Sequence, residues 1–466
     1  MKRAFLTALV LAAAFQVSRA QPAPPSFAAG RLTPQVACTA DPKQTYALYL
    51  PSAFSVARQW PIVYVFDPAA RGPLAAGVVQ AAAEKLGYIV AASNNSRNGV
   101  KGGSTEAAQA MWQDTQRRFP IDERRRYVAG MSGGARVAAG LAVSCDGCFA
   151  GVIANAAGFP NGTTLPKQVK FAYFAAVGDA DFNYGEFVEL RHNLDAIGAQ
   201  YRIRIFPGPH DWAPAEVWEE ALNWMDIRAM AAGTLARDPA RIQSTLEETL
   251  TRARALEARN DWLGAFREYQ SAARDFAGLA DVAAAKERVV KLENDKAVKS
   301  GEKREKSEIE LQARIEAGPS AQIRKISTGD LDSIEVPPLR AAFIDLKKQA
   351  SEPGSDNLIA RRALGDLVVG VYESGDNSME HRDYRAALLY FDLAAAGARD
   401  PSWAHYQRAR AYAVISQKKE MLAELRLSLA GSFHDASALD AAEFQAYRSL
   451  PEFQAVVEEW KRKSQP

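Results

Sequence analysis

Serine, carboxylate and histidine side chains occur in this sequence in an order that could support attack on an acyl carbon. Ser132 stands at the centre of a Gly-x-Ser-x-Gly pentapeptide. Two carboxylates follow at Asp179 and Asp181, and His210 comes after both. A serine hydroxyl is a poor nucleophile until an imidazole accepts its proton, and the imidazole needs a carboxylate that fixes its tautomer and stabilises its charge. The residue types and their order therefore predict chemistry through an acyl-serine.

His210 is the histidine best placed for this chemistry. The sequence has five histidines, and only His210 follows a predicted strand, in the loop Pro207 to Trp212. A lone loop histidine is commonly just solvated, but the serine and carboxylates before it favour a general base. The other four lie in helical patterns or in the distant helical half: His192, His381, His405 and His434.

The glycines around Ser132 indicate a nucleophile elbow. A β-branched and aromatic run, Tyr127 to Met131, precedes the serine, and an Ala-rich helical pattern follows it. A serine at the apex of a strand–turn–helix takes a strained backbone conformation, so the residues two before and two after it must be very small. Here they are Gly130 and Gly134. The pentapeptide by itself could arise by chance in an Ala- and Gly-rich chain.

Strand-like and helical patterns alternate around this elbow. Strands are predicted at 46–50, 62–66, 88–92, 127–131, 149–154, 171–177 and 201–206, and helices at 74–86, 105–119, 185–197 and 215–230. Such alternation predicts a mostly parallel sheet with helices on both faces. Reacting groups collect on the loops at the carboxyl ends of the strands in such sheets. The serine, acid and histidine loops all follow predicted strands.

Residues 36 to about 230 resemble the small, lidless esterases of the α/β-hydrolase fold, similar to the polyhydroxybutyrate depolymerase and feruloyl esterase families. The matching pieces are Tyr49-Leu50-Pro51, Leu86-Gly87-Tyr88-Ile89-Val90, Ile121-Asp122, Arg126-Tyr127-Val128, and Gly208 with His210 and Trp212. The resemblance implies a serine hydrolase of carboxylic esters, and we expect no cofactor or metal. The family's Gly-x-x-Asp acid motif matches Gly178 and Asp181. Asp181 is therefore the expected partner of His210, and Asp179 is expected to bind the amides of its own loop.

The sequence departs from these families after the strand at 62–66. The families have a His-Gly pair whose backbone amides stabilise the oxyanion, whereas this chain has Asp67 followed by Pro68, which has no N–H. We expect one oxyanion donor at Gly133, the residue after the nucleophile, and a second at Ala69. Asp67 would repel an oxyanion unless its charge is tied down, and Arg71 is the candidate for that role.

The sequence predicts an open cleft with a polar rim. Asn94 and Asn95 follow the strand at 88–92 and are candidate substrate contacts, with plain turn formation as the alternative. Trp212 is a third candidate. The segment between Ala154 and Phe171 is too short for a cap domain. An open cleft favours a bulky or polymeric ester substrate.

From Gln243 onward the chain is predicted to be helical, because Ala, Leu, Arg and Glu recur at helical spacing. Residues 260–276 and 381–401 resemble the second helix of a tetratricopeptide repeat, and Ala423 follows Ala387 at close to the ~34-residue period of that repeat. Such repeats offer a groove to a peptide or protein partner. A helical cap on the hydrolase, or self-association, is the alternative.

Composition and the N-terminus predict an exported, multidomain protein. The 466 residues exceed one ordinary core, and 57 Lys and Arg against 55 Asp and Glu give no basic excess for nucleic acid. Lys2 and Arg3 precede an apolar run that is shorter than the ~20 residues of a membrane span. We expect cleavage near Ala20, a periplasmic or secreted protein and no stable membrane insertion; an uncleaved anchor is the alternative. The expected segments are a signal peptide at 1–20, a linker at 21–35, a hydrolase domain at 36–232, a helical region with a charged helix at 243–320 and a helical domain at 339–466.

Three cysteines leave the disulfide pairing open. Cys145 and Cys148 could pair with each other, or one of them could pair with Cys38. A redox Cys-x-x-Cys begins a helix after a strand, whereas this one follows a helix, which disfavours a catalytic thiol.

The main functional prediction is an exported serine hydrolase that cleaves carboxylic esters in an open cleft through a Ser-His-Asp acyl-enzyme mechanism. The missing His-Gly pair and the long helical half are also compatible with a protein-binding scaffold whose hydrolase domain has lost activity. A serine peptidase on the same triad is a further alternative.

Overall fold

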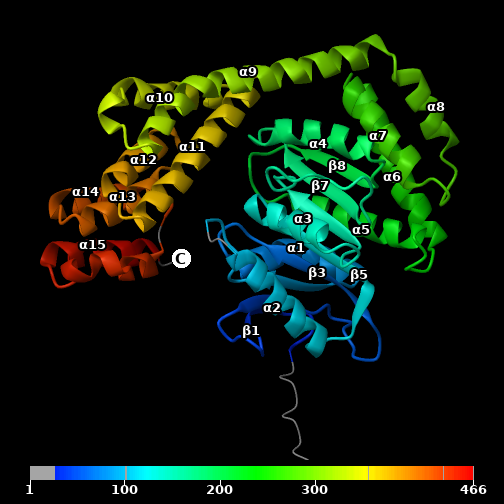
Figure 1. Ribbon diagram of the computed structural model, residues 1–466, viewed down its shortest axis with the longest axis horizontal. Coiled ribbons are helices and arrows are strands. Elements are labelled where there is room, and N and C mark those ends of the chain that lie inside the picture. The colour runs from blue at the N-terminus through cyan, green and yellow to red at the C-terminus, as the bar shows by residue number, and fades with distance from the viewer. Residues whose placement is uncertain (1–26, 100–101, 355, 434, 465–466) are drawn as a thin grey trace, which may run out of the picture.

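The first half of the chain forms a mostly parallel sheet flanked by helices (Figure 1). The computed structural model describes residues 27–99, 102–354, 356–433 and 435–464, and within them this sheet has eight strands in the order β1-β2-β4-β3-β5-β6-β7-β8. β2 pairs antiparallel with β1 and β4, and the other neighbours pair parallel. The predicted signal peptide at 1–20 and the start of the linker lie outside the described residues. The strands are β1 Leu32–Ala37, β2 Thr45–Tyr49, β3 Trp60–Phe66, β4 Ile89–Ser93, β5 Ile121–Met131, β6 Gly151–Asn155, β7 Ala172–Gly178 and β8 Tyr201–Phe206.

Helices cover both faces of the sheet. The helices of this half are α1 Gly72–Leu86, α2 Gly103–Arg118, α3 Gly133–Ser144, α4 Tyr184–Ala196 and α5 Ala215–Ala231. One apolar cluster joins the sheet to α2, α3 and α4, and a second joins it to α1 and α5. Because both faces are covered, every residue of the central strands β3, β4, β6 and β7 is buried.

The strand register aligns the ends of the strands that precede the predicted site loops. Met131 of β5 pairs with Asn155 of β6, which pairs with Ala176 of β7, and Gly178 of β7 pairs with Phe206 of β8. The carboxyl ends of these four strands therefore lie along one edge of the sheet. The loops that carry Ser132, Asp181 and His210 must meet there.

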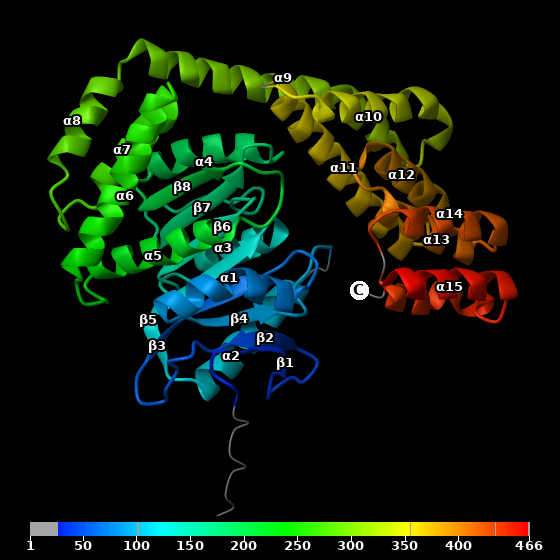
Figure 2. The same cartoon turned by 180° about the vertical axis from the view of Figure 1, so that it is seen from behind.

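The helical half curves around this sheet domain (Figures 1 and 2). In both views, α6 to α8 lie on one side, α9 passes over α4, and α10 to α15 lie on the other side. Among the described helices none has the length and hydropathy of a membrane span. The helices are α6 Pro239–Ala258, α7 Trp262–Asp275, α8 Ala283–Leu292, α9 Lys296–Ser327, α10 Val336–Ser351, α11 Asp356–Glu380, α12 Tyr384–Gly397, α13 Ser402–Val414, α14 Lys418–Ala430 and α15 Pro451–Ser464, with short 3₁₀ turns at Leu331–Ser333, Ala436–Asp440 and Ala442–Tyr447.

A buried charge network fixes α7 to the edge strand β8. The Arg202 side chain, 4% exposed, forms ion pairs with Glu220, Glu268 and Asp275. Asp275 also accepts a hydrogen bond from the indole N–H of Trp224. An arginine buried this deeply must be paired, and the pairing ties β8 to α5 and α7.

The helical half has no break at residue 320. α9 is continuous to Ser327 and joins α6–α8 to the helices from α10 onward. α7 and α12, the two predicted repeat helices, each begin with an aspartate N-cap, at Asp261 and Asp383, after a residue with positive φ. The small positions Ala265 and Ala387 are buried in both helices. These features match the local pattern, and the tetratricopeptide-like assignment stays a prediction.

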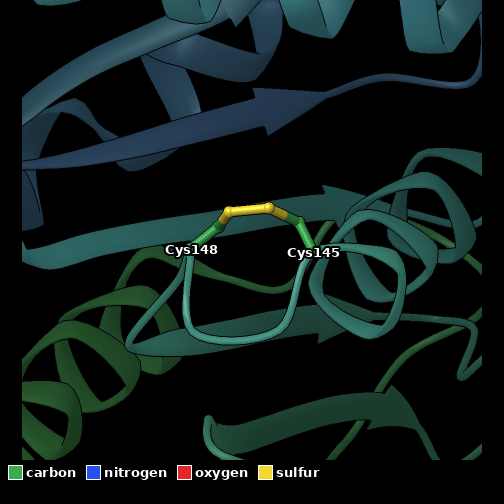
Figure 3. Close-up of a disulfide and its surroundings, with 2 residues drawn as sticks. All are labelled: Cys145 and Cys148. Atoms are coloured by element: carbon green, nitrogen blue, oxygen red, sulfur yellow. A yellow bond between two sulfur atoms is a disulfide. The ribbon is translucent and has the colours of Figure 1, made fainter.

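Cys145 and Cys148 form a disulfide after α3 (Figure 3). Of the pairings that the sequence leaves open, the structure has this one, and Cys38 is buried as a free thiol. Burial raises the pKa of the Cys38 thiol to about 11. Cys38 is therefore protonated and unreactive near neutral pH.

Candidate active site

Ser132 occupies a sharp turn between β5 and α3. Its backbone has φ 54° and ψ −123°. A positive φ of this kind costs a non-glycine residue about 1–3 kcal/mol. A hydrogen bond of 2.8 Å from the Ser132 N–H to the Asn155 carbonyl fixes the turn. Because α3 starts at Gly133, the serine lies at the positive end of a helix dipole.

Gly130 and Gly134 allow three backbones to approach one another at this turn. A Cβ on Gly130 would lie 2.4 Å from the carbonyl oxygen of Gly134. A Cβ on Gly134 would lie 2.0 Å from the carbonyl oxygen of Phe66, at the end of β3. Because the obstructing atoms are backbone, they cannot rotate away. The predicted nucleophile elbow is therefore present, with the strand–turn–helix geometry of the α/β-hydrolase fold.

The three predicted side chains meet at the elbow. The Ser132 Oγ lies 2.9 Å from Nε2 of His210, and Nδ1 of His210 lies 2.8 Å from Oδ1 of Asp181. Asp181 is fully buried, and the His210 side chain is 11% exposed. With Nδ1 protonated, the imidazole donates to Asp181 and leaves Nε2 to accept the serine proton.

Asp179 has a different role in the same loop. Its Oδ1 accepts a hydrogen bond from the Gly208 N–H at 3.0 Å, and its own N–H donates to the Phe206 carbonyl. The prediction that Asp179 binds the amides of its own loop is wrong, because its carboxylate binds an amide of the histidine loop. Within the acid loop it is Asp181 Oδ1 that accepts from the Asn183 N–H. The two loops touch at Gly178, where a Cβ would lie 2.2 Å from the Gly208 carbonyl oxygen.

Asn155 is a site residue that the sequence analysis missed. Its carbonyl accepts from the Ser132 N–H, and its side-chain Oδ1 accepts from the Ala213 N–H at 2.7 Å. Its Nδ2 donates to the carbonyl of Asp211 at 3.3 Å. Asn155 thus ties the serine turn to the loop that carries His210. The available signal was a polar residue that ends an otherwise apolar strand beside the elbow strand.

Asp67 is held as a carboxylate next to the elbow. It is fully buried and receives hydrogen bonds from Nε and Nη2 of Arg71 and from the indole N–H of Trp212. Burial by itself would raise the pKa of Asp67, but the Arg71 and Ala69 hydrogen bonds outweigh it, so the pKa lies below its usual value. The prediction that Arg71 ties down this charge is confirmed.

The prediction that Ala69 donates to the oxyanion is wrong. The Ala69 N–H donates to Oδ1 of Asp67 at 2.8 Å, so its hydrogen is not directed at a substrate. The Asp67 side chain captures the amide two residues later, as aspartates in turns commonly do. Gly133 lies in the first turn of α3, where N–H groups lack intrahelical partners, and its role as an oxyanion donor stays a prediction.

The three predicted substrate contacts have other partners. Asn94 Nδ2 donates to the Pro34 carbonyl and to the Thr45 hydroxyl. Asn95 accepts from the Thr45 N–H and donates to the Lys43 carbonyl. Both asparagines thus tie their loop to β1, to β2 and to the residues before β2. These long-range contacts are neither substrate contacts nor plain turn formation. Trp212 lies at the site, but its indole N–H donates a hydrogen bond to Asp67.

The predicted open cleft is also wrong, because α11 contacts loops on both sides of Ser132. On one side, Phe182 stacks on His210 with ring centroids 4.0 Å apart, and a Cβ on Gly365 would lie 3.4 Å from the Phe182 ring. On the other side, Asn98 Nδ2 donates to Glu373 Oε1 at 2.9 Å. The sequence analysis considered only an insertion between β6 and β7, whereas the cover comes from the C-terminal half.

Acidic groups of α11 face the site from this cover. Burial raises the pKa of the Asp366 carboxyl, the nearby His210 opposes that shift, and Glu373 adds to it. The carboxamide of Asn98 lies against Gly133, since a Cβ there would be 1.8 Å from Asn98 Oδ1. Within the described residues no cluster of three or more His, Cys, Asp and Glu side chains could hold a metal ion.

Solved structures with a similar fold include several hydrolases, while no family model and no curated protein sequence matches the chain. A ferulic acid esterase is 19% identical, and the match covers 38% of this chain and 88% of that one with a TM-score of 0.32. An S-formylglutathione hydrolase from Staphylococcus aureus is 15% identical, and the match covers 39% of this chain and 90% of that one with a TM-score of 0.32. The feruloyl esterase module from Clostridium thermocellum is 14% identical, and the match covers 43% of this chain and 91% of that one with a TM-score of 0.33. These likenesses assign no activity to the chain.

The close approach at the elbow predicts that two glycine substitutions have opposite effects. Gly134→Ala places a Cβ against the Phe66 carbonyl and should destabilise the protein by about 1–3 kcal/mol. Gly77→Ala is the matched control, because Gly77 is exposed on α1 with open space around it, and it should stabilise by about 0.5–1 kcal/mol. Thermal melting of both variants and of the parent protein measures these changes in stability. Parent-like melting of Gly134→Ala would contradict the geometry.

Proposed function

We propose that this chain is an exported serine hydrolase that cleaves carboxylic esters through an acyl-enzyme. The observation that carries the proposal is the pair of hydrogen bonds that His210 makes, one with Ser132 and one with Asp181. A hydroxyl, an imidazole and a buried carboxylate in this sequence form the arrangement that general-base activation of serine requires.

In the acylation step, Ser132 Oγ attacks the ester carbonyl carbon while Nε2 of His210 takes the hydroxyl proton. Asp181 stabilises the resulting imidazolium through Nδ1–H. The carbonyl oxygen becomes an oxyanion, for which the Gly133 N–H and the positive end of α3 provide stabilisation. When the intermediate collapses, the C–O bond to the alcohol breaks and His210 returns its proton to the leaving oxygen.

Deacylation repeats these events with water. His210 takes a proton from a water molecule that attacks the acyl-serine carbonyl, and the same donors stabilise the second oxyanion. The intermediate releases a carboxylic acid, and the proton on His210 returns to Ser132 Oγ. Phe182 covers one face of the imidazole throughout and limits its rotation.

Export is proposed from the N-terminal sequence and is supported by the cysteines. The Cys145–Cys148 disulfide suits an oxidising compartment such as the periplasm or the outside of the cell. The proposed partners are an ester substrate and, through the helical repeats, a peptide or protein. Because α11 contacts loops on both sides of Ser132, the argument from an open cleft to a bulky or polymeric substrate no longer holds, and the substrate is proposed only as a carboxylic ester.

Two alternatives are separated by experiment. A scaffold without activity is disfavoured by the intact Ser132–His210–Asp181 hydrogen bonds, which a chain that had lost catalysis would not need to keep.

A peptidase could use the same groups, so a panel of p-nitrophenyl esters and matched p-nitroanilides decides between ester and amide hydrolysis. We expect turnover of the esters and little or none of the anilides.

The assignment of the nucleophile predicts covalent labelling at one serine. A fluorophosphonate probe should label Ser132, since the activated Oγ attacks phosphorus as it attacks a carbonyl. Ser132→Ala should abolish both labelling and ester turnover. Ser244→Ala, an exposed serine on α6, is the control and should label like the parent. Undiminished labelling of Ser132→Ala would refute the assignment.

The different contacts of the two loop aspartates predict different phenotypes. Asp181→Asn should lower kcat by roughly a thousandfold or more with little change in KM, because His210 loses the carboxylate that holds its tautomer. Asp179→Asn should keep activity and lower stability by about 1 kcal/mol, since only the bond to the Gly208 N–H weakens. Steady-state kinetics and melting curves on both variants test this. An inactive Asp179→Asn beside an active Asp181→Asn would show that the acid is misassigned.

A further inference from the structure

Residues 179–184, between β7 and α4, form the segment that presents the acid to His210. This acid segment contains Asp181 and also Phe182, whose ring stacks on the imidazole. Within the segment, the Asn183 N–H donates to Asp181 Oδ1 at 2.8 Å, the Asp181 N–H to Gly178, the Tyr184 N–H to Asp181 and the Asn183 side chain to Ala156. The Asp179 and Ala180 N–H groups donate to Phe206 and Gly208, next to the histidine. Such a short loop needs further contacts to hold one carboxylate oxygen within hydrogen-bonding distance of one ring nitrogen.

Arg362 of α11 supplies contacts at both ends of the acid segment. Its Nε donates to the Asp179 carbonyl at 2.7 Å, and its guanidinium lies 3.8 Å from the centroid of the Tyr184 ring. The side chain is 3% exposed, and Nη1 lies 3.8 Å from Glu308 of α9. A single planar group therefore fixes the first and last residues of the segment.

The middle of the acid segment is held by the same two helices. Gln312 of α9 donates from Nε2 to the Phe182 carbonyl at 3.0 Å. Gly365 is three residues after Arg362 and so lies on the same face of α11, where a Cβ would be in van der Waals contact with the Phe182 ring. Phe182 is thereby enclosed between α11 and His210.

These contacts are strong enough to matter for the geometry of the site. A hydrogen bond from a charged donor is about twice as strong as one between neutral groups, and a cation–π contact becomes stronger when it is shielded from water. Misplacing a catalytic group by about 1 Å can lower a rate by about a hundredfold. Loss of Arg362 would remove one contact at each end of the acid segment, and the positions of Asp181 and Phe182 against His210 would be less tightly fixed.

We propose that Arg362 is a positioning residue for the Ser132–His210–Asp181 site, so that the helical half is a working part of the catalytic unit and not only a neighbouring domain. This proposal rests on the proposed hydrolase function. Arg362 touches neither the reacting atoms nor His210, and it acts by holding the acid segment from the opposite side.

The test compares Arg362→Met and Arg362→Lys in the full-length protein with a matched control, Arg408→Met. Arg408 is an arginine of α13 that pairs with Asp392 of α12 and Glu424 of α14, so its loss weakens the helical half without touching the acid segment. The measurements are kcat and KM on p-nitrophenyl acetate, the rate of fluorophosphonate labelling at Ser132, and the melting temperature. Gln312→Ala is a second variant for the case that Arg362→Met does not fold.

We expect Arg362→Met to lower kcat and the labelling rate by about tenfold to a hundredfold while KM changes less than about twofold. Arg362→Lys should recover part of the loss, because its ammonium can still donate to the Asp179 carbonyl. Gln312→Ala should show a smaller fall of the same kind. Arg408→Met should lower the melting temperature and leave kcat of the folded protein at the parent value.

Two results would overturn the proposal. One is a folded Arg362→Met, or Gln312→Ala if the former does not fold, with kcat and labelling rate equal to those of the parent. The other is a fall in kcat for Arg408→Met as large as that for Arg362→Met, which would show a general effect of stability. If the parent itself neither hydrolyses esters nor labels at Ser132, the proposed function fails first and the role of Arg362 fails with it.

Discussion

The site depends on the contact between three backbones at the elbow, where β5 turns into α3 against the end of β3. Glycine at positions 130 and 134 lets these backbones touch, and the contact holds Ser132 at a positive φ that an ordinary turn would relax. The parallel register then brings the ends of β6, β7 and β8 level with the serine. The acid and histidine loops meet Ser132 because the strands below them end together, and Asn155 and Asp179 lock the three loops to one another.

The helical half is joined to this edge at points that bear on chemistry. Buried ion pairs of Arg202 fix α7 to β8, and α9 and α11 contact the residues around Asp181 and Phe182. Burying arginines at these joints is costly unless each one is paired or hydrogen-bonded, so a rearrangement of the helices would leave charges unsatisfied. The sheet domain and the helices from α6 to α11 are therefore best regarded as one mechanical unit.

Local pattern was sufficient to predict the residues that meet in the site and every strand of the sheet except β1, which lies mostly in the segment predicted as a linker. It was not sufficient to predict the long-range contacts. The elbow glycines, the alternation of strands and helices, and Ser132, Asp181 and His210 all have local signatures. The capture of the Ala69 amide by Asp67 depends on a buried carboxylate, and the cover over the site comes from α11, far along the chain. Asn94 and Asn95 were misjudged for the same reason, since their partners lie on and before β2. A single sequence contains no direct signal for such pairings.

The central claim is that Ser132 carries the acyl group between the two half-reactions. The most direct measurement is rapid acid quenching during turnover of a p-nitrophenyl ester, followed by mass spectrometry of the digested protein. The account predicts that the peptide containing Ser132 gains the mass of the acyl group, and that this adduct is absent in Ser132→Ala. An acyl adduct on another residue, or steady turnover by Ser132→Ala, would contradict it.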